Sequence, residues 1–175
     1  LNMCGIGLVN KDDEHAPQII KAANCELYTY SEESKEADFV ASDIRYVSQP
    51  DFVGTEFHIS GKYDMEVRLG IPGLFNVVNA LAAVSVCSFL ELDQARISHA
   101  LENIRVNGRM EIVYTSERCT VLVDYAHNAV SMESLLSTLR DYKPKRLVCV
   151  FGCGGNRSKD RRYSMGEIGG KMADL

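Results

Sequence analysis

Residues 120–152 read TVLVDYAHNAVSMESLLSTLRDYKPKRLVCVFG, and this stretch contains the pattern that decides the fold class. The run over 119–126 is typical of a strand, the run over 131–143 has the apolar spacing of an amphipathic helix, and residues 145–152 are continuously apolar. A continuously apolar strand is typical of the interior of a parallel sheet. A strand, a helix and a strand in this order imply a right-handed crossover, so we expect an α/β protein.

The N-terminal part of the chain predicts a second α/β region. Residues 6–10 and 25–30 favour strands on either side of a helix over 14–23, which is a βαβ-like unit. Three runs rich in β-branched and aromatic residues follow, over 38–47, 51–60 and 65–70. Their connections are too short for helical crossovers, so we expect an antiparallel meander.

Two helices and a linker come next. Residues 74–92 are apolar nearly all round, as in a buried helix, and Asp93 is the expected N-cap of a second helix over 94–104. The segment 106–110, VNGRM, breaks the periodicity and indicates a domain junction. A strand over 110–115 then begins the last region, so we expect two domains, residues 1–108 and 109–175.

The composition excludes several classes of protein. The 175 residues are 46% hydrophobic and 25% charged, with a net charge of −5. This acidity argues against a general nucleic-acid binder or membrane-surface protein, and the chain has no apolar run of about 20 residues. The first residues lack the features of a signal peptide, so we expect a cytoplasmic protein.

Cysteine and histidine patterns argue against disulfides and zinc. The six cysteines are spread through apolar segments, so we expect free and mostly buried thiols. The four histidines have no metal-binding spacing, and no metal ligand is predicted in this chain.

The glycine-rich run FGCGGNRSKDRR, residues 151–162, is the first candidate site. Its glycines would let backbone amides approach a ligand, and Arg157 and Lys159 add positive charge beyond a strand's carboxyl end, where ligands bind in open α/β sheets. The run is not a dinucleotide fingerprint, because Arg157 stands where Gly or Ala is needed. The alternative is a solvated basic turn.

Three further sites could carry chemistry. Asn76 and Asn79 are three residues apart on one helix, where they could bind a purine edge or bond within a core. Asp124 and His127 follow a predicted strand; the carboxylate could bind ribose hydroxyls or cap the following turn. Arg109 lies at the domain junction, where it could reach a phosphate or pair with Glu111. No nucleophile accompanies these residues, so none is predicted to be catalytic.

The chain lacks a Walker A sequence. The required pattern is GxxxxGK[ST], and neither Gly61-Lys62 nor Gly170-Lys171 has the necessary neighbours. We therefore expect that the isolated chain neither hydrolyses ATP nor uses it in a reaction.

Four blocks of sequence occur in the order GIPGLFNVVNALAA, VNGRMEIV, VLVDYAHNAVSMESLL and VFGCGGNRSKDRRYSMGEI. Together they resemble the Mur ligase family, and within it the MurE branch. The resemblance extends from about residue 70 to residue 175 and is weaker before that. It implies the later part of a central ATPase domain, with βα units, a small antiparallel sheet and two helices, followed by the first part of a Rossmann-like domain.

The resemblance also implies an activity. Such ligases use ATP and Mg²⁺ to phosphorylate the carboxylate of UDP-MurNAc-L-Ala-D-Glu, and the amine of a diamino acid, meso-diaminopimelate or lysine, then displaces phosphate in peptidoglycan synthesis. By position, the family's nucleotide-binding residues correspond to Asn76, Asn79, Arg109, Asp124 and His127. Its amino-acid-binding arginine corresponds to Arg157, with Lys159 adjacent.

This chain departs from the family pattern at several places. Asn107 and Tyr163 stand where the family has proline, and Asn128-Ala129 replaces Thr-Pro. Asn156 stands where the family has aspartate, which removes a charge beside Arg157. The phosphate loop, carbamylated lysine and UDP-binding domain are expected before this segment, and the amino-acid-selecting loop after it.

Two alternatives remain open. The chain could come from another Mur-like ligase, such as a relative of folylpolyglutamate synthase, or it could be a non-enzymatic nucleotide-binding or interaction domain. An internal fragment would also expose strand edges and apolar faces, so we expect some self-association.

Overall fold

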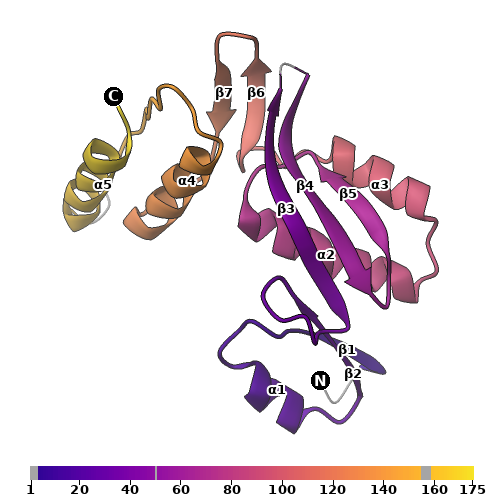
Figure 1. Ribbon diagram of the computed structural model, residues 1–175. Helices are drawn as coiled ribbons and strands as arrows, with labels where there is room; N and C mark the ends of the chain where they lie inside the picture. The colour runs from indigo at the N-terminus through magenta and orange to yellow at the C-terminus, as the bar shows by residue number, and fades with distance from the viewer. Residues whose placement is uncertain (1–3, 50, 155–158) are drawn as a thin grey trace. The chain divides into compact units, whose positions relative to one another are not determined.

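The computed structural model describes residues 4–49, 51–154 and 159–175. The chain divides into two compact units (Figure 1). The N-terminal unit comprises residues 1–47 and 52–105, and the C-terminal unit comprises residues 48–51 and 106–175.

The N-terminal unit is built on a five-stranded mixed sheet with the order β1-β2-β3-β4-β5. Its strands are β1 (Ile6–Asn10), β2 (Glu26–Ser31), β3 (Phe39–Gln49), β4 (Phe52–Gly61) and β5 (Met65–Leu69). β1 pairs in parallel with β2, and helix α1 (Ala16–Ala22) connects them, which confirms the βαβ-like prediction. β3 and β4 run in opposite directions in Figure 1, and β4 pairs antiparallel with β5, as the meander requires.

The sequence prediction separated the βαβ-like unit from the meander, whereas the structure joins them. β2 pairs in parallel with β3, through Tyr30 with Phe39 and Ser31 with Val40. The last residues of β2 pair with the first residues of β3. The connection over 32–38 therefore does not have to span the length of a strand, and a short loop is enough. The Asp38 carboxylate fixes this junction by accepting hydrogen bonds from the amide and hydroxyl of Thr29, at 2.8 and 3.0 Å.

Helices α2 (Leu74–Phe89) and α3 (Gln94–Asn103) complete the N-terminal unit. Val77, Leu81 and Val84 of α2 are buried in one hydrophobic core with Phe57 and Ile59 of the sheet. The prediction of a helix buried all round is wrong, because the opposite face of α2 exposes apolar side chains that include Phe75 and Val86.

The predicted cap of α3 is present. The Asp93 side chain accepts a hydrogen bond from the amide of Arg96 at 3.0 Å, which satisfies one of the free donors of the first turn. The amide of Gly70, which follows β5, donates to the carbonyl of Leu101 of α3 at 2.9 Å. This bond holds the end of β5 and the end of α3 together.

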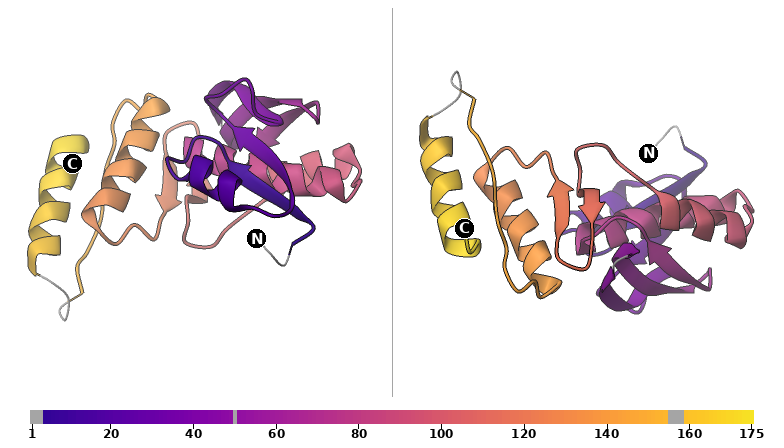
Figure 2. Two further views of the ribbon diagram at one scale, coloured as in Figure 1. Left: turned by 90° about the horizontal axis from the view of Figure 1, so that it is seen from below. Right: turned by 90° about the horizontal axis from the view of Figure 1, so that it is seen from above.

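The C-terminal unit contains a two-stranded antiparallel sheet and two helices. The elements are β6 (Glu111–Thr115), β7 (Thr120–Val123), α4 (Ala129–Asp141) and α5 (Lys159–Met172). α4 and α5 pack side by side in both views of Figure 2, around Met132, Leu136, Leu147 and Met165.

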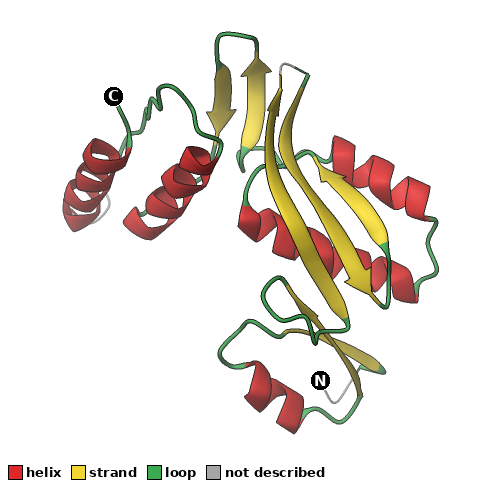
Figure 3. Cartoon of the chain, in the orientation of Figure 1, coloured by secondary structure: helices red, strands yellow, loops and turns green. Residues whose placement is uncertain are grey.

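The predicted strand over 145–152 is wrong, since this segment is drawn as a loop in Figure 3. Its apolar pattern suits a buried strand, but a strand requires backbone partners on a neighbouring strand. The backbone hydrogen bonds of this segment to a distant part of the chain run from the amide of Asp174 to the carbonyl of Leu147 and from the amide of Cys149 to the carbonyl of Leu175. Val150 is 93% exposed. The strand–helix–strand crossover is therefore not formed in this chain.

The cysteine prediction is correct about the redox state and wrong about burial. All six thiols are free, but Cys4 and Cys119 are exposed and the other four are half-buried. Cys87 packs against the core of the N-terminal unit, and Cys149 and Cys153 pack against the Met132 cluster, but none of the three is fully covered. Among the described residues, no helix has the length and apolar character needed to cross a membrane.

Candidate functional site

The two asparagines lie in the first half of α2 and have different surroundings. Asn76 is half-buried, and its side-chain NH₂ donates to the carbonyl of Pro72 at 2.7 Å. This bond is the local role that was the alternative to ligand binding. Asn79 is exposed, and its amide has no hydrogen-bond partner among the described residues. Of the pair, Asn79 therefore has the side chain that is free to bind a ligand.

Arg109 lies in a tight turn at the start of the C-terminal unit. The residues on either side of it have positive φ angles, 70° at Gly108 and 45° at Met110. Arg109 is exposed, and its guanidinium contacts no acid among the residues that the structure describes. The expected alternative, a pair with Glu111, is not formed, because the Glu111 carboxylate instead accepts the amide of Gly108 at 2.7 Å.

Asp124 directly follows β7 and is half-buried. One carboxylate oxygen accepts the amide of Ala126 at 2.7 Å, so the residue does cap the following turn. The other oxygen accepts the amide of Met110 at 2.8 Å, so Asp124 also holds the turn that contains Arg109. A carboxylate has about four lone-pair positions, so these two bonds leave acceptor capacity for a ribose hydroxyl.

Tyr125 and His127 follow Asp124 with exposed side chains. Their rings are 5.1 Å apart between centroids and tilted by 51°, and the His127 Nδ1 lies 3.3 Å from the carbonyl of Tyr125. The imidazole therefore has a neighbouring aromatic face and a local backbone contact.

The departure at Asn128-Ala129 has a structural explanation. Asn128 is the N-cap of α4, and its side chain accepts the amide of Ser131 at 2.9 Å. Ser131 returns a contact to the amide of Asn128 at 3.3 Å, which completes a capping box. The helix thus starts at a capping box, without the rigid φ angle of a proline.

The glycine-rich candidate is only partly described. Arg157 lies outside the described residues, whereas Lys159 is the exposed first residue of α5. An added Cβ at Gly152 or Gly154 would meet nothing within 4 Å, and neither has a positive φ angle. Their lack of a side chain is therefore not required by packing or backbone conformation in this chain.

Sequence reasoning missed the role of Glu111. It considered this residue only as a partner for the Arg109 side chain, whereas the structure uses it as an acceptor for the backbone of the same turn. The available signal was the spacing, because a carboxylate three residues after Gly108 can reach back to that amide.

No group of three or more His, Cys, Asp or Glu side chains that could hold a metal ion occurs in the described ranges of the chain.

Comparisons with known proteins follow the division into two units. Residues 1–87 match the Mur ligase middle domain, and residues 108–175 match the Mur ligase glutamate ligase domain. The chain belongs to the Mur ligase family, whose members are ATP-dependent amide ligases. Asn76 and Asn79 lie in the part matched to the middle domain, and Arg109, Asp124 and His127 lie in the part matched to the glutamate ligase domain.

Relatives with one shared description match nearly the whole chain. The chain is 38% identical over 177 residues to the UDP-N-acetylmuramoyl-L-alanyl-D-glutamate--2,6-diaminopimelate ligase of Alkaliphilus oremlandii (strain OhILAs), covering 98% of this chain and 35% of that protein. A solved structure of a ligase with the same description has a TM-score of 0.73 and 28% identity, over 96% of this chain and 35% of the other. A crystal structure of MurF from Acinetobacter baumannii, at 23% identity, has a TM-score of 0.76 over 97% of this chain and 36% of the other, which shows the shared fold. The chain spans about a third of the length of these proteins.

Proposed function

We propose that this chain is part of an ATP-dependent ligase that couples a diamino acid to UDP-MurNAc-L-Ala-D-Glu in peptidoglycan synthesis. The carrying observation is the alignment over 98% of the chain, at 38% identity, with a relative named as a 2,6-diaminopimelate ligase. In the reaction, ATP phosphorylates the glutamate carboxylate, and the amine of the diamino acid attacks the acyl phosphate and releases phosphate. The protein is proposed to be cytoplasmic.

In this proposal the described residues bind the nucleotide, and none of them reacts covalently. The free guanidinium of Arg109 would neutralise charge on the ATP phosphates, since a planar guanidinium matches phosphate oxygens. The spare acceptor positions of Asp124 would bind ribose hydroxyls. Asn76 and Asn79, which belong to the N-terminal unit, are also proposed to bind the nucleotide. His127 would pack near the base or ribose.

The amino-acid side of the site is proposed to use Arg157 and Lys159. Both carry positive charge next to the glycine-rich run, and a diamino acid such as meso-diaminopimelate presents carboxylates to such groups. The open space around Gly152 and Gly154 supports close approach of a ligand to the backbone there. Magnesium would supply charge screening at the phosphates, with ligands from other parts of the ligase.

The test is a ligation assay on the intact protein that carries this chain. It would be incubated with ATP, Mg²⁺, UDP-MurNAc-L-Ala-D-Glu and either meso-diaminopimelate or L-lysine, and phosphate and the tripeptide product would be measured. We expect phosphate release that requires both the dipeptide and one diamino acid. Release with folate and glutamate instead would favour the folylpolyglutamate synthase alternative, and ATP binding without any turnover would favour a non-enzymatic domain.

Arg109→Ala tests the site assignment in the same assay. Loss of a charge-assisted phosphate contact is expected to raise KM for ATP about 10-fold or more. Arg118→Ala is the matched control, because Arg118 is an exposed arginine in the turn between β6 and β7 of the same unit. Equal effects of the two substitutions would contradict the role of Arg109.

A further inference from the structure

We propose that Glu111 is a positioning residue: its carboxylate fixes the backbone of the turn over 108–110 in the conformation that presents Arg109 to the nucleotide phosphates. The proposal rests on the proposed function, because it requires Arg109 to bind ATP. It adds a residue to the site that has no direct contact with the nucleotide.

The turn is held by an acid on each side of Arg109. Glu111, the first residue of β6, accepts the amide of Gly108 at 2.7 Å, and Asp124, at the end of β7, accepts the amide of Met110 at 2.8 Å. The amide of Arg109 itself donates to the carbonyl of Val106 at 3.0 Å. Three consecutive backbone amides are thus satisfied, and two of them by charged acceptors, whose hydrogen bonds are stronger than neutral ones.

The backbone conformation needs this support. Met110 has a φ angle of 45°, which is unfavourable for a residue with a side chain, yet its side chain is only 2% exposed. Such a conformation persists when surrounding contacts determine it. The buried Met110 side chain and the two carboxylates provide these contacts and set the direction of the Arg109 side chain between them.

The Glu111 carboxylate does not pair with Arg109 in the described part of the chain. Its Oε2 atom is engaged with Gly108, and no ion pair between Glu111 and Arg109 is formed in the described chain. The guanidinium is therefore left exposed while its backbone is fixed. A rigid backbone with an unpaired cationic side chain is the arrangement expected of a preorganised phosphate ligand.

The experiment is a double-mutant cycle in the intact protein, with KM for ATP and kcat measured separately. Glu111→Ala is expected to raise KM for ATP about 5–20-fold and to lower kcat less. Glu111→Gln, which keeps an oxygen acceptor for the amide of Gly108, should restore most of the affinity. In the Arg109→Ala background, Glu111→Ala should add no further loss, because it acts through Arg109.

Glu117→Ala is the matched control, since Glu117 is an exposed glutamate in the β6–β7 turn of the same hairpin. Hydrogen exchange of the peptide containing residues 106–110 provides a second measurement, and Glu111→Ala should speed this exchange whereas Glu117→Ala should not. Unchanged exchange in Glu111→Ala would contradict the proposal.

The outcomes separate the two proposals. If Arg109→Ala leaves KM for ATP unchanged, the nucleotide role of Arg109 is wrong, and the positioning role falls with it. Arg109→Ala could raise KM for ATP, and Glu111→Ala could then raise KM in the Arg109→Ala background by the same factor as it does alone. In that case only the positioning role is wrong. Glu111 would then act on the fold without acting through Arg109.

Discussion

The carboxylate of Asp124 accepts a hydrogen bond from the backbone amide of Met110 at 2.8 Å. This bond joins the end of β7 to the turn that precedes β6, across 14 positions of sequence. Asp124 also accepts the amide of Ala126 at 2.7 Å, so one side chain shapes the backbone both before and after the β6–β7 hairpin.

Asp124→Ala is expected to destabilise the C-terminal unit by about 1–3 kcal/mol, because two backbone amides lose a charged acceptor. Asp124→Asn keeps one oxygen acceptor and should cost less. Urea unfolding followed by circular dichroism would measure both variants. Equal stability of Asp124→Ala and the unsubstituted chain would show that water replaces the carboxylate without loss.

Gly54→Ala is expected to disrupt the N-terminal unit. A Cβ at this position would lie 2.1 Å from the carbonyl oxygen of Leu69 and 2.7 Å from the Phe52 ring, and the Leu69 backbone cannot move without breaking the pairing of β4 with β5. We expect a loss above about 2 kcal/mol or failure to fold. Gly5→Ala, where a Cβ meets nothing within 4 Å, is the control and should be neutral in thermal unfolding.

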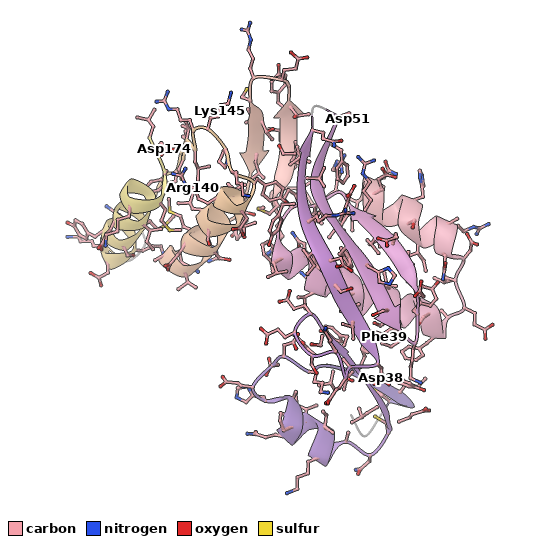
Figure 4. All side chains as sticks on the ribbon, in the orientation of Figure 1. Asp38, Phe39, Asp51, Arg140, Lys145 and Asp174 are labelled. Atoms are coloured by element: carbon pink, nitrogen blue, oxygen red, sulfur yellow. The ribbon has the colours of Figure 1, made fainter. Side chains whose placement is uncertain are left out.

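Acid sensitivity is expected from the ion pair between Arg140 and Asp174, which are labelled in Figure 4. The Arg140 guanidinium and the Leu147 amide hold the pKa of Asp174 below its ordinary value of 3.8. The unfolded chain therefore binds a proton more readily, so the stabilisation is complete above about pH 5 and is lost as the pH falls through the lowered pKa.

Arg140→Ala should weaken this dependence, because the Leu147 amide still lowers the pKa of Asp174. It should also lower the melting temperature at pH 7, because Arg140 donates to the carbonyl of Met172 at 2.8 Å. Asp174→Asn should remove the dependence. Thermal unfolding at pH 3 and pH 7 would measure the pH dependence. Lys145→Ala, in the loop that follows α4, is the control. A change in melting temperature between pH 3 and pH 7 that is the same in all variants would contradict the assignment.

Alkylation should distinguish the cysteines. Burial raises the pKa of the Cys149 thiol, which packs against the cluster of Met132, Leu136, Leu147 and Met165. The thiolate is the reactive form, so Cys149 should react with iodoacetamide more slowly than the exposed Cys119 at pH 8. Mass spectrometry at successive times would show the order, and faster labelling of Cys149 would indicate that the cluster is open in solution.

The isolated 175-residue chain is expected to show no ATP hydrolysis, because its sequence has no Walker A loop. A phosphate-release assay on highly purified chain would test this, with Arg109→Ala to identify contamination. Turnover above background that disappears in Arg109→Ala would overturn the expectation.

Sequence reasoning predicted the local elements of the N-terminal unit well. Alternation and turn residues located β3, β4 and β5, and the polar residue before an apolar helix identified Asp93 as a cap, because both signals depend on neighbours in sequence. The strand over 145–152 was predicted for the same reason, yet it is not formed. A strand depends on partners elsewhere in the chain, and its own apolar pattern does not supply them.

The candidate site shows the same limit. The residue types and spacing located Asn76, Asn79, Arg109 and Asp124, but not which of their polar atoms are already used. Hydrogen bonds to Pro72 and Met110 became visible only in three dimensions. Asn79 and Arg109 have no side-chain partner among the residues that the structure describes, and the Asp124 carboxylate is divided between backbone amides and any ligand.

The amino-acid sequence by itself determined the family pattern, the order of elements in the N-terminal unit and the absence of a Walker A loop, because these depend on residue types at short range. The tertiary structure alone decided that β2 joins the meander and that the turn around Arg109 is held by Glu111 and Asp124. Pairing register and carboxylate–amide bonds between distant residues depend on where the folded backbone brings each donor and acceptor, and local sequence does not contain that information.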